Sequence, residues 1–338
     1  MNGAMTRAEM TASDGPLLFG RVLDGAGGGA PITWDEARDW RPERPGAVLW
    51  LHLDRTLPEV RAWLLHTLSL PEPTAELLTS DDTRPRAFRE GETLVATLRT
   101  INFNPGAEPE DMVSMQLWSD GTRVLTFRRH WLQGPRQVLA LVDGGGPGPT
   151  DAGALITSLV EHMIHHMNHS VIDMNEQIDA LFAVDGADDR ADDLLGRISA
   201  IRRDCLALKR HMGPEHVALE AIARDAPGWF EPHDRREIGE SIALLRRFLD
   251  DIDVSKESAV VLMDEIRGRS LARSERTNRL LTVVATVFLP LTFLTGLLGM
   301  NVEGIPAAEH PLAFWSVVGL CGVVLIVQVM LFRRWRWL

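Results

Sequence analysis

Two long uncharged stretches near the end of the chain, residues 280–302 and 310–332, constrain its fold more than any other feature. Each holds 23 residues, and a helix of about 20 apolar residues crosses a hydrocarbon core roughly 30 Å thick. Buried helices of soluble proteins rarely run so far without a charge. Residues 303–309 between the stretches are just enough to reverse the chain. The pattern predicts a helical hairpin, transmembrane helix 280–302 followed by transmembrane helix 310–332, behind a large body outside the membrane.

Charged residues around the hairpin predict its orientation. The loop at 303–309 has Glu303 and Glu309 and no basic residue, whereas Arg side chains lie on both outer flanks. Because cytoplasmic segments next to membrane helices are enriched in Lys and Arg, both chain ends are expected in the cytoplasm and the loop outside. We therefore expect a multi-pass protein of the cytoplasmic (inner) membrane that contacts lipid and ends in a basic cytoplasmic tail, 333–338. The flanking basic residues are Arg267, Arg269, Arg273, Arg276, Arg279, Arg333, Arg334 and Arg336.

Residues 16–143 read as an α+β cytoplasmic domain. Short apolar runs predict strands, helical segments are expected near 58–68, 73–79 and 135–141, and Asp120-Gly121 predicts a hairpin. Six residues could suggest a pocket, but core packing is the favoured interpretation: Trp34, Trp40, Trp50, His52, Asp54 and Trp63. No G-x-G-x-x-G, P-loop or nucleophile elbow occurs in this region, so no enzyme is predicted. Residues 1–15 are expected to be a disordered lead. The predicted strands are 17–23, 47–53, 94–103, 113–118 and 122–127.

The pattern changes to long helices after residues 144–150, a linker rich in Gly and Pro. A helical stalk is expected over 151–279. The first helix of this stalk, 152–183, has one apolar stripe. The second helix, 194–224, is expected to break near Gly213-Pro214, and the third helix begins near 232–234. The third helix has no stop signal before the membrane, so it would run into the first span for roughly 100 Å in all. A helix of that length requires neighbours from the same chain or from other subunits.

The net charge and the cysteine content exclude some classes of partner and site. The formal net charge is −12, and residues 280–338 hold three Arg and two Glu, so the preceding part carries −13. Such an acidic body argues against nucleic acid as a partner and suits cations. Cys205 and Cys321 are far apart in the sequence, so neither a disulfide framework nor a CxxC zinc site is predicted.

Small and hydroxyl residues follow one face of the first span at helical spacing. Such a face allows close approach of membrane helices, and it would equally form a pore wall with few charges. Both interpretations remain open from the stripe alone. Its members are Asn278, Thr282, Ala285, Leu289, Thr292, Gly296 and Gly299.

The motif Gly299-Met300-Asn301 closes this span, after VFLPLTFLTGLLG and before a short outer loop, a final span and a terminal Arg-Trp-Leu. In this arrangement the chain resembles the CorA superfamily of divalent-cation transporters. The segment RTNR before the span and the outer residues Val302 and Gly304-Ile305-Pro306 are similar to the ZntB branch. The resemblance implies a funnel-shaped homopentamer that transports divalent cations, Zn²⁺ foremost and with possible proton coupling, with no permanently bound cofactor.

The same resemblance implies the roles of individual residues. Gly299, Met300 and Asn301 would form the ion-recognition turn, and Glu303, a departure from the family pattern, would add an outer ring of carboxylates. Leu281 and Leu289 are candidates for an apolar constriction. The expected pore-lining set is Asn278, Leu281, Thr282, Ala285, Leu289, Thr292 and Gly296.

Four histidines, His162, His165, His166 and His169, share one face of the first stalk helix. Pairs of His at i and i+4 have the spacing that binds Zn²⁺. A solvated polar face is the alternative interpretation, and a cytoplasmic metal or regulatory site is the hypothesis.

Two functions of different class follow from the sequence. The first is a pentameric Zn²⁺ transporter, with a Mg²⁺/Co²⁺ channel as its alternative, because the GMN motif does not separate them. The second is a membrane-anchored metal sensor without transport. Replacement of Asn301 should abolish metal flux in the first case and leave it unchanged in the second.

Overall fold

The computed structural model describes residues 15–102, 104, 106, 112–144, 146–182, 191–300 and 312–334. The chain divides into two compact units: residues 1–185 with 196–261, and residues 186–195 with 262–338. Several predictions lie outside the described residues: the disordered lead up to residue 14, the outer loop 303–309 and the end of the basic tail at 335–338.

The first unit is built on a seven-stranded mixed sheet with strand order β2-β1-β3-β7-β6-β5-β4. Strands β3 and β7 pair in parallel, and every other neighbouring pair is antiparallel. All five predicted strands are present, whereas the two sheet-edge strands, β2 and β4, were missed. The strands are β1 (Leu17–Leu23), β2 (Gly29–Pro31), β3 (Val48–Asp54), β4 (Arg86–Glu90), β5 (Thr93–Thr100), β6 (Val113–Ser119) and β7 (Arg123–Arg128).

Both faces of the sheet are covered, which explains why β3 is an almost continuous apolar run. On one face, Leu49, Leu51 and Leu53 pack in a core with residues of α1 (Trp34–Arg38), α2 (Pro58–His66) and α3 (Glu72–Thr79). On the other face, Trp50 and His52 are buried, as predicted, and both hydrogen-bond the hydroxyl of Thr126. Of the other predicted core residues, Trp63 is buried, whereas Trp34, Trp40 and Asp54 are only half-buried. Helix α5 (Ala152–Phe182) contacts β5 and β7, and α4 (Gln133–Asp143) packs on α5.

The predicted hairpin at Asp120-Gly121 joins β6 to β7. The Asp120 carboxylate accepts hydrogen bonds from the backbone N–H groups of Thr122 and Arg123. Gly121 has a φ of +84°, a left-handed conformation that favours glycine. A Cβ at this position would also lie 2.6 Å from the ring of Trp229. The turn therefore requires glycine both for its backbone conformation and for lack of space.

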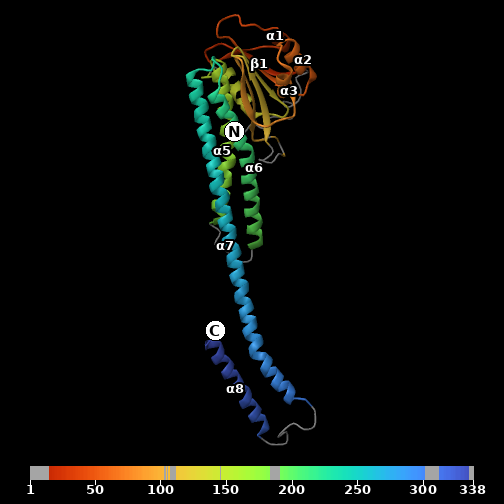
Figure 1. Ribbon diagram of the computed structural model, residues 1–338, viewed down its shortest axis with the longest axis vertical. Coiled ribbons are helices and arrows are strands. Elements are labelled where there is room, and N and C mark those ends of the chain that lie inside the picture. The colour runs from red at the N-terminus through yellow and green to blue at the C-terminus, as the bar shows by residue number, and fades with distance from the viewer. Residues whose placement is uncertain are drawn as a thin grey trace. The chain divides into compact units, whose positions relative to one another are not determined.

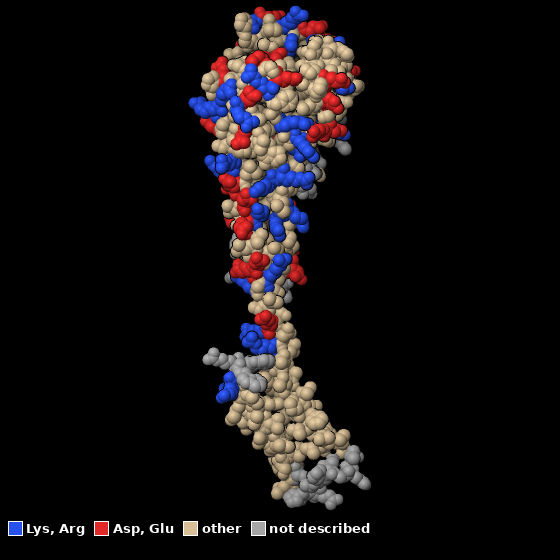
Figure 2. Space-filling model, viewed as in Figure 1, with Lys and Arg blue, Asp and Glu red and all other residues tan. Residues whose placement is uncertain are grey.

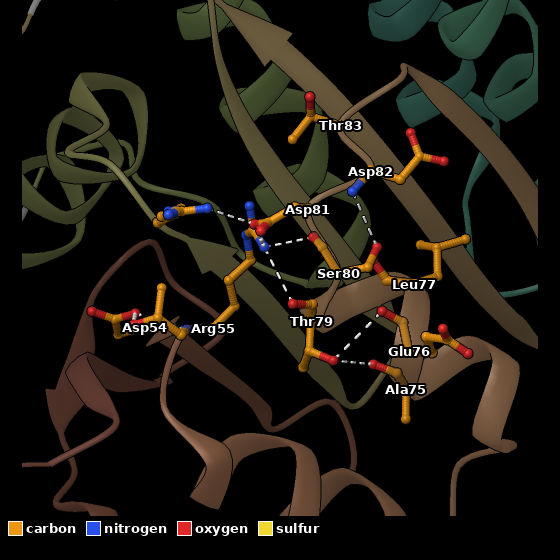
Figure 3. A network of polar contacts seen from close by, with 12 residues as sticks. Asp54, Arg55, Ala75, Glu76, Leu77, Thr79, Ser80, Asp81, Asp82 and Thr83 are labelled. Carbon is orange, nitrogen blue, oxygen red and sulfur yellow. Dashed lines mark hydrogen bonds and ion pairs between the residues drawn. The ribbon is translucent and has the colours of Figure 1, made fainter.

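A buried arginine joins the end of β3 to the end of α3 (Figure 3). The Arg55 Nη1 donates to the carbonyls of Thr79 and Ser80, at 3.2 and 2.5 Å, and to the Asp81 carboxylate at 3.2 Å. Arg129 donates to the same carboxylate at 2.8 Å. These hydrogen bonds, that of Arg129 first, hold the pKa of Asp81 below its usual value. Arg55 thus satisfies the last carbonyls of α3, which have no partner within the helix.

Three long helices complete the first unit, where α5, α6 (Ala191–Arg224) and the first part of α7 (Pro232–Leu298) lie side by side (Figure 1). The predicted apolar stripe of α5 is buried, which confirms it. Cys205 of α6 contacts Met174 of α5, and Lys209 of α6 pairs with Asp253 of α7 at 2.5 Å. The stripe comprises Ile156, Leu159, Val160, Met163, Met167, Met174, Ile178 and Leu181.

The predicted break at Gly213-Pro214 is wrong, because α6 continues through it. Proline removes one backbone hydrogen bond from a helix interior. Here its ring lies on the exposed side, while the flanking Met212 and Glu215 are buried against the rest of the unit. Tertiary packing on both sides of Pro214 therefore holds the helix together. By contrast, the expectation of one uninterrupted helix from about residue 232 into the first span is confirmed, since α7 has 67 residues.

Candidate ion-conducting hairpin

The second unit contains the end of α7 and α8 (Ala313–Arg334), both long and apolar enough to cross a membrane. Their most apolar windows have mean hydropathies of 2.1 and 2.3. Figure 2 shows that charged side chains cover the body in this view, whereas the surface of the hairpin is almost wholly uncharged. A surface of exposed large apolar side chains, such as Phe288, Leu289 and Phe293, is stable in contact with lipid or with other membrane helices.

One face of the membrane part of α7 is half-buried within the unit and the opposite face is open. The half-buried positions are Val283, Val287, Pro290, Leu291, Leu294 and Leu298. At 3.6 residues per turn these positions form a single stripe. Because α8 is the other apolar helix of this unit, we assign this stripe to the side of α7 turned toward α8.

The seven predicted pore-lining residues are all exposed and lie around the opposite side of α7. Their face is therefore not occupied by α8 of the same chain. The threonines along α7 satisfy their own hydroxyls: the Thr282 hydroxyl donates to the Asn278 carbonyl at 2.8 Å, and that of Thr295 donates to the Leu291 carbonyl at 3.0 Å. Such bonds to the preceding turn leave the hydroxyl oxygen able to accept from water.

Helix α7 ends at Leu298, immediately before the predicted recognition turn. The N–H of Gly299 donates to the Thr295 carbonyl at 2.9 Å, and a Cβ on Gly299 would lie 2.9 Å from that same oxygen. The chain therefore leaves the helix through a turn that has little space for a side chain. Met300 is exposed. The predictions for Asn301 and Glu303 lie outside the described residues.

The three histidines of α5 whose side chains are described, His162, His165 and His166, have different neighbours. His162 Nδ1 is 2.8 Å from the Ser158 carbonyl, and His166 Nε2 is 2.7 Å from the Gln137 side-chain oxygen of α4. His165 lines a cavity of about 290 Å³ together with Glu161, Glu237 and Glu240. The side chain of His169 lies outside the described residues. Among the side chains that the structure describes, no three His, Cys, Asp or Glu gather closely enough to hold a metal ion.

Sequence reasoning missed one polar residue of the hairpin, Gln328 of α8, whose side-chain nitrogen is 3.1 Å from the backbone carbonyl of Thr286. The signal was present in the sequence as an amide within an otherwise apolar span. Its partner, 42 residues away, was not.

Comparison with known proteins agrees with this architecture. Residues 45–334 match the model of the family described as CorA-like Mg²⁺ transporter protein. The chain is 36% identical to the divalent cation transporter CmaX of Pseudomonas aeruginosa strain PAO1, over 95% of this chain and 97% of that one. It is 32% identical to the zinc transport protein ZntB of Pectobacterium atrosepticum, over 94% of each chain.

A solved structure of full-length CmaX is similar to the fold, with a TM-score of 0.83 and 34% identity over 95% of this chain and 98% of that one. The similarity therefore covers the sheet, the long helices and the two spans together. With its family model matching most of the sequence, and with two relatives above 30% identity along nearly its whole length, this chain belongs to the CorA-like family of divalent-cation transporters.

Proposed function

We propose that this protein transports Zn²⁺ in preference to other divalent cations, across the inner membrane and through a pore formed by a ring of five copies. The observation that carries the proposal is the open face of α7, where seven uncharged residues are exposed opposite the side turned toward α8. In a ring, these faces converge on one axis and enclose an uncharged path. The names of the ZntB relatives favour Zn²⁺ as cargo.

The mouth of this pore is proposed to be the turn that follows α7. The tight turn at Gly299 would bring the backbone and the Asn301 amide of each copy toward the axis, where carbonyl oxygens contact a hydrated cation. Glu303 would raise the local cation concentration through its charge. An amide at a membrane boundary is costly against lipid, so Asn301 is expected to face water or a partner copy.

The rest of the proposal concerns the body and its orientation. Both termini are placed in the cytoplasm on the strength of the basic flanks, and the acidic body would concentrate cations near the inner opening. The protein is proposed to be a transporter without enzymatic activity or a resident cofactor. We also propose, from the resemblance to the ZntB branch, that transport is coupled to protons. The cytoplasmic His cluster remains a secondary proposal and rests on the i, i+4 spacing of the four histidines in the sequence.

Flux into liposomes tests the proposal. Purified full-length protein is reconstituted, and Zn²⁺ and Mg²⁺ uptake are measured separately for the parent and for Asn301→Ala. A matched amide substitution far from the pore, Gln177→Ala on the exposed side of α5, serves as control. We expect Zn²⁺ flux in the parent and in the control, and its loss in Asn301→Ala.

Other outcomes of the flux experiment would favour one of the alternative functions. Mg²⁺ flux without Zn²⁺ flux would identify a Mg²⁺/Co²⁺ channel. No flux of either ion, from protein shown to be folded and oligomeric, would favour the metal sensor. Zn²⁺ flux that persists in Asn301→Ala would refute the proposed mouth.

A further inference from the structure

Gln328 places a polar amide on the side of α8 that packs within the hairpin, about two turns before the helix ends. Apart from half-buried Gly322, the described buried and half-buried residues of this helix recur every three or four positions and form one stripe, of which Gln328 is the polar member. An amide at this depth is costly unless it finds a hydrogen-bond partner, because lipid offers none. The stripe consists of Val317, Cys321, Val324, Gln328 and Phe332.

The partner of Gln328 is a carbonyl that a proline has deprived of its helical donor. In an α-helix the carbonyl of residue i accepts from the N–H of residue i+4. For Thr286 that residue is Pro290, which has no N–H. Gln328 Nε2 lies 3.1 Å from this same carbonyl oxygen. The amide of α8 thus occupies the position of the donor that α7 itself lacks.

The contact is specific in its atoms. The Thr286 hydroxyl donates to the Thr282 carbonyl at 2.7 Å, so the side chain of Thr286 is engaged within its own helix. Gln328 Oε1 is buried and accepts no hydrogen bond from the residues that the structure describes. Because a carbonyl only accepts, the nitrogen must be the end of the amide that faces Thr286. The amide is therefore oriented by this one donated bond.

We propose that Gln328 is a positioning residue for transport: its amide replaces the hydrogen bond that Pro290 removes from α7, and so fixes the pore helix against α8 at the proline. Around α7, Thr286 lies between the stripe turned toward α8 and the open pore-lining face. A bond at this position limits bending and rotation of α7 where proline weakens the helix. The proposal rests on the transport function, because it assigns Gln328 a role in ordering the pore face.

A double-mutant cycle tests the inference on the full-length protein. Gln328→Met keeps the length of the side chain and removes the donor, whereas Pro290→Ala restores the N–H that Thr286 needs. The four proteins of the cycle are compared in liposomes by Zn²⁺ uptake rate at saturating and at limiting metal. Gln177→Met, an exposed amide of α5, controls for the chemical change.

We expect Gln328→Met to lower the saturating uptake rate by about 3-fold to 20-fold, the range of measured interhelical hydrogen bonds in membranes. The metal concentration for half-maximal uptake should not change, since Gln328 does not contact the ion. In the Pro290→Ala background the same substitution should lower the rate by less than about 2-fold, because the carbonyl then has a partner within α7. Equal losses in the two backgrounds, or no loss with proline present, would overturn the proposal.

Thermal unfolding of the same four proteins in detergent is the second readout and does not depend on transport. Gln328→Met should lower the midpoint with Pro290 present and leave it nearly unchanged in the Pro290→Ala background. If the parent moves no metal, the proposed function fails while this stability cycle still tests the contact. Parallel midpoint losses in the two backgrounds would refute the contact even if transport were found.

Discussion

The buried carboxyl of Glu215 predicts how the folding stability of the protein changes with pH. Its side chain is 2% exposed on α6, next to Pro214, and its Oε2 accepts a hydrogen bond from the backbone N–H of Arg99 at 2.8 Å. Burial raises the pKa of this carboxyl to about 8, although the hydrogen bond and the charge of Arg99 act in the opposite direction. Glu215→Gln keeps an oxygen that can accept from Arg99 and removes the titration.

The sign of the effect follows from the protons bound by each state. Between the ordinary pKa of 4.5 and about 8, the folded protein holds a proton on Glu215 that the unfolded chain has released. Folding stability therefore decreases as pH rises through this window, by at most about 1.4 kcal/mol per pH unit. His211 contributes in the opposite direction, since burial and Arg99 lower its pKa from 6.5. His52 acts in the same direction as His211, because burial lowers its pKa well below 6.5, and both act mainly at lower pH. Glu215 therefore dominates from about pH 6.5 to 8, where its own contribution to stability falls by about 2 kcal/mol.

The assay is thermal unfolding of the full-length protein in detergent at several pH values across this window. For a domain of roughly 150–250 residues, 2 kcal/mol corresponds to about 4–8 °C in midpoint. The parent should lose this amount between pH 6.5 and 8, and Glu215→Gln should lose much less. Glu257→Gln, at an exposed Glu of α7, should behave as the parent. Parallel curves for the parent and Glu215→Gln would refute the assignment of a buried, protonated carboxyl.

Two further predictions concern the hairpin and the body. Gly299→Ala should reduce Zn²⁺ uptake at least several-fold, because the added Cβ would lie 2.9 Å from the Thr295 carbonyl oxygen. Gly319→Ala on α8, where a Cβ would have no neighbour within 4 Å, should retain Zn²⁺ uptake. Equal uptake by the two variants would contradict a crowded turn at Gly299. Arg55→Met should lower the free energy of unfolding by about 2–4 kcal/mol, since it leaves the carbonyls of Thr79 and Ser80 at the end of α3 without their donor. Denaturant unfolding measures this loss, and a change below about 1 kcal/mol would show that water replaces the guanidinium.

The sequence by itself determined the features that depend on local composition. Two uncharged 23-residue stretches allow little besides membrane helices. Asp120-Gly121 specifies a hairpin through its own backbone preference, and the spacing of apolar residues in α5 and in β3 reports which faces are buried. The GMN motif with its flanking residues pointed to the transporter family before any tertiary contact was known.

Edge strands and helix continuity were decided by tertiary contacts. Strand β4, with the charged sequence RAFRE, exists because it pairs with β5, and β2 consists of only three residues paired with β1. Local propensity favours neither. Helix α6 passes through Pro214 because packing on either side offsets the hydrogen bond that proline removes.

Two long-range polar contacts, one in the body and one in the hairpin, could not be predicted from the sequence. Glu215 with Arg99, and Gln328 with Thr286, join residues 116 and 42 positions apart. No periodicity or motif encodes such pairs, because each depends on two separate segments meeting in a particular register. Only the tertiary structure shows that an amide of the following span supplies the donor that Pro290 removes from α7.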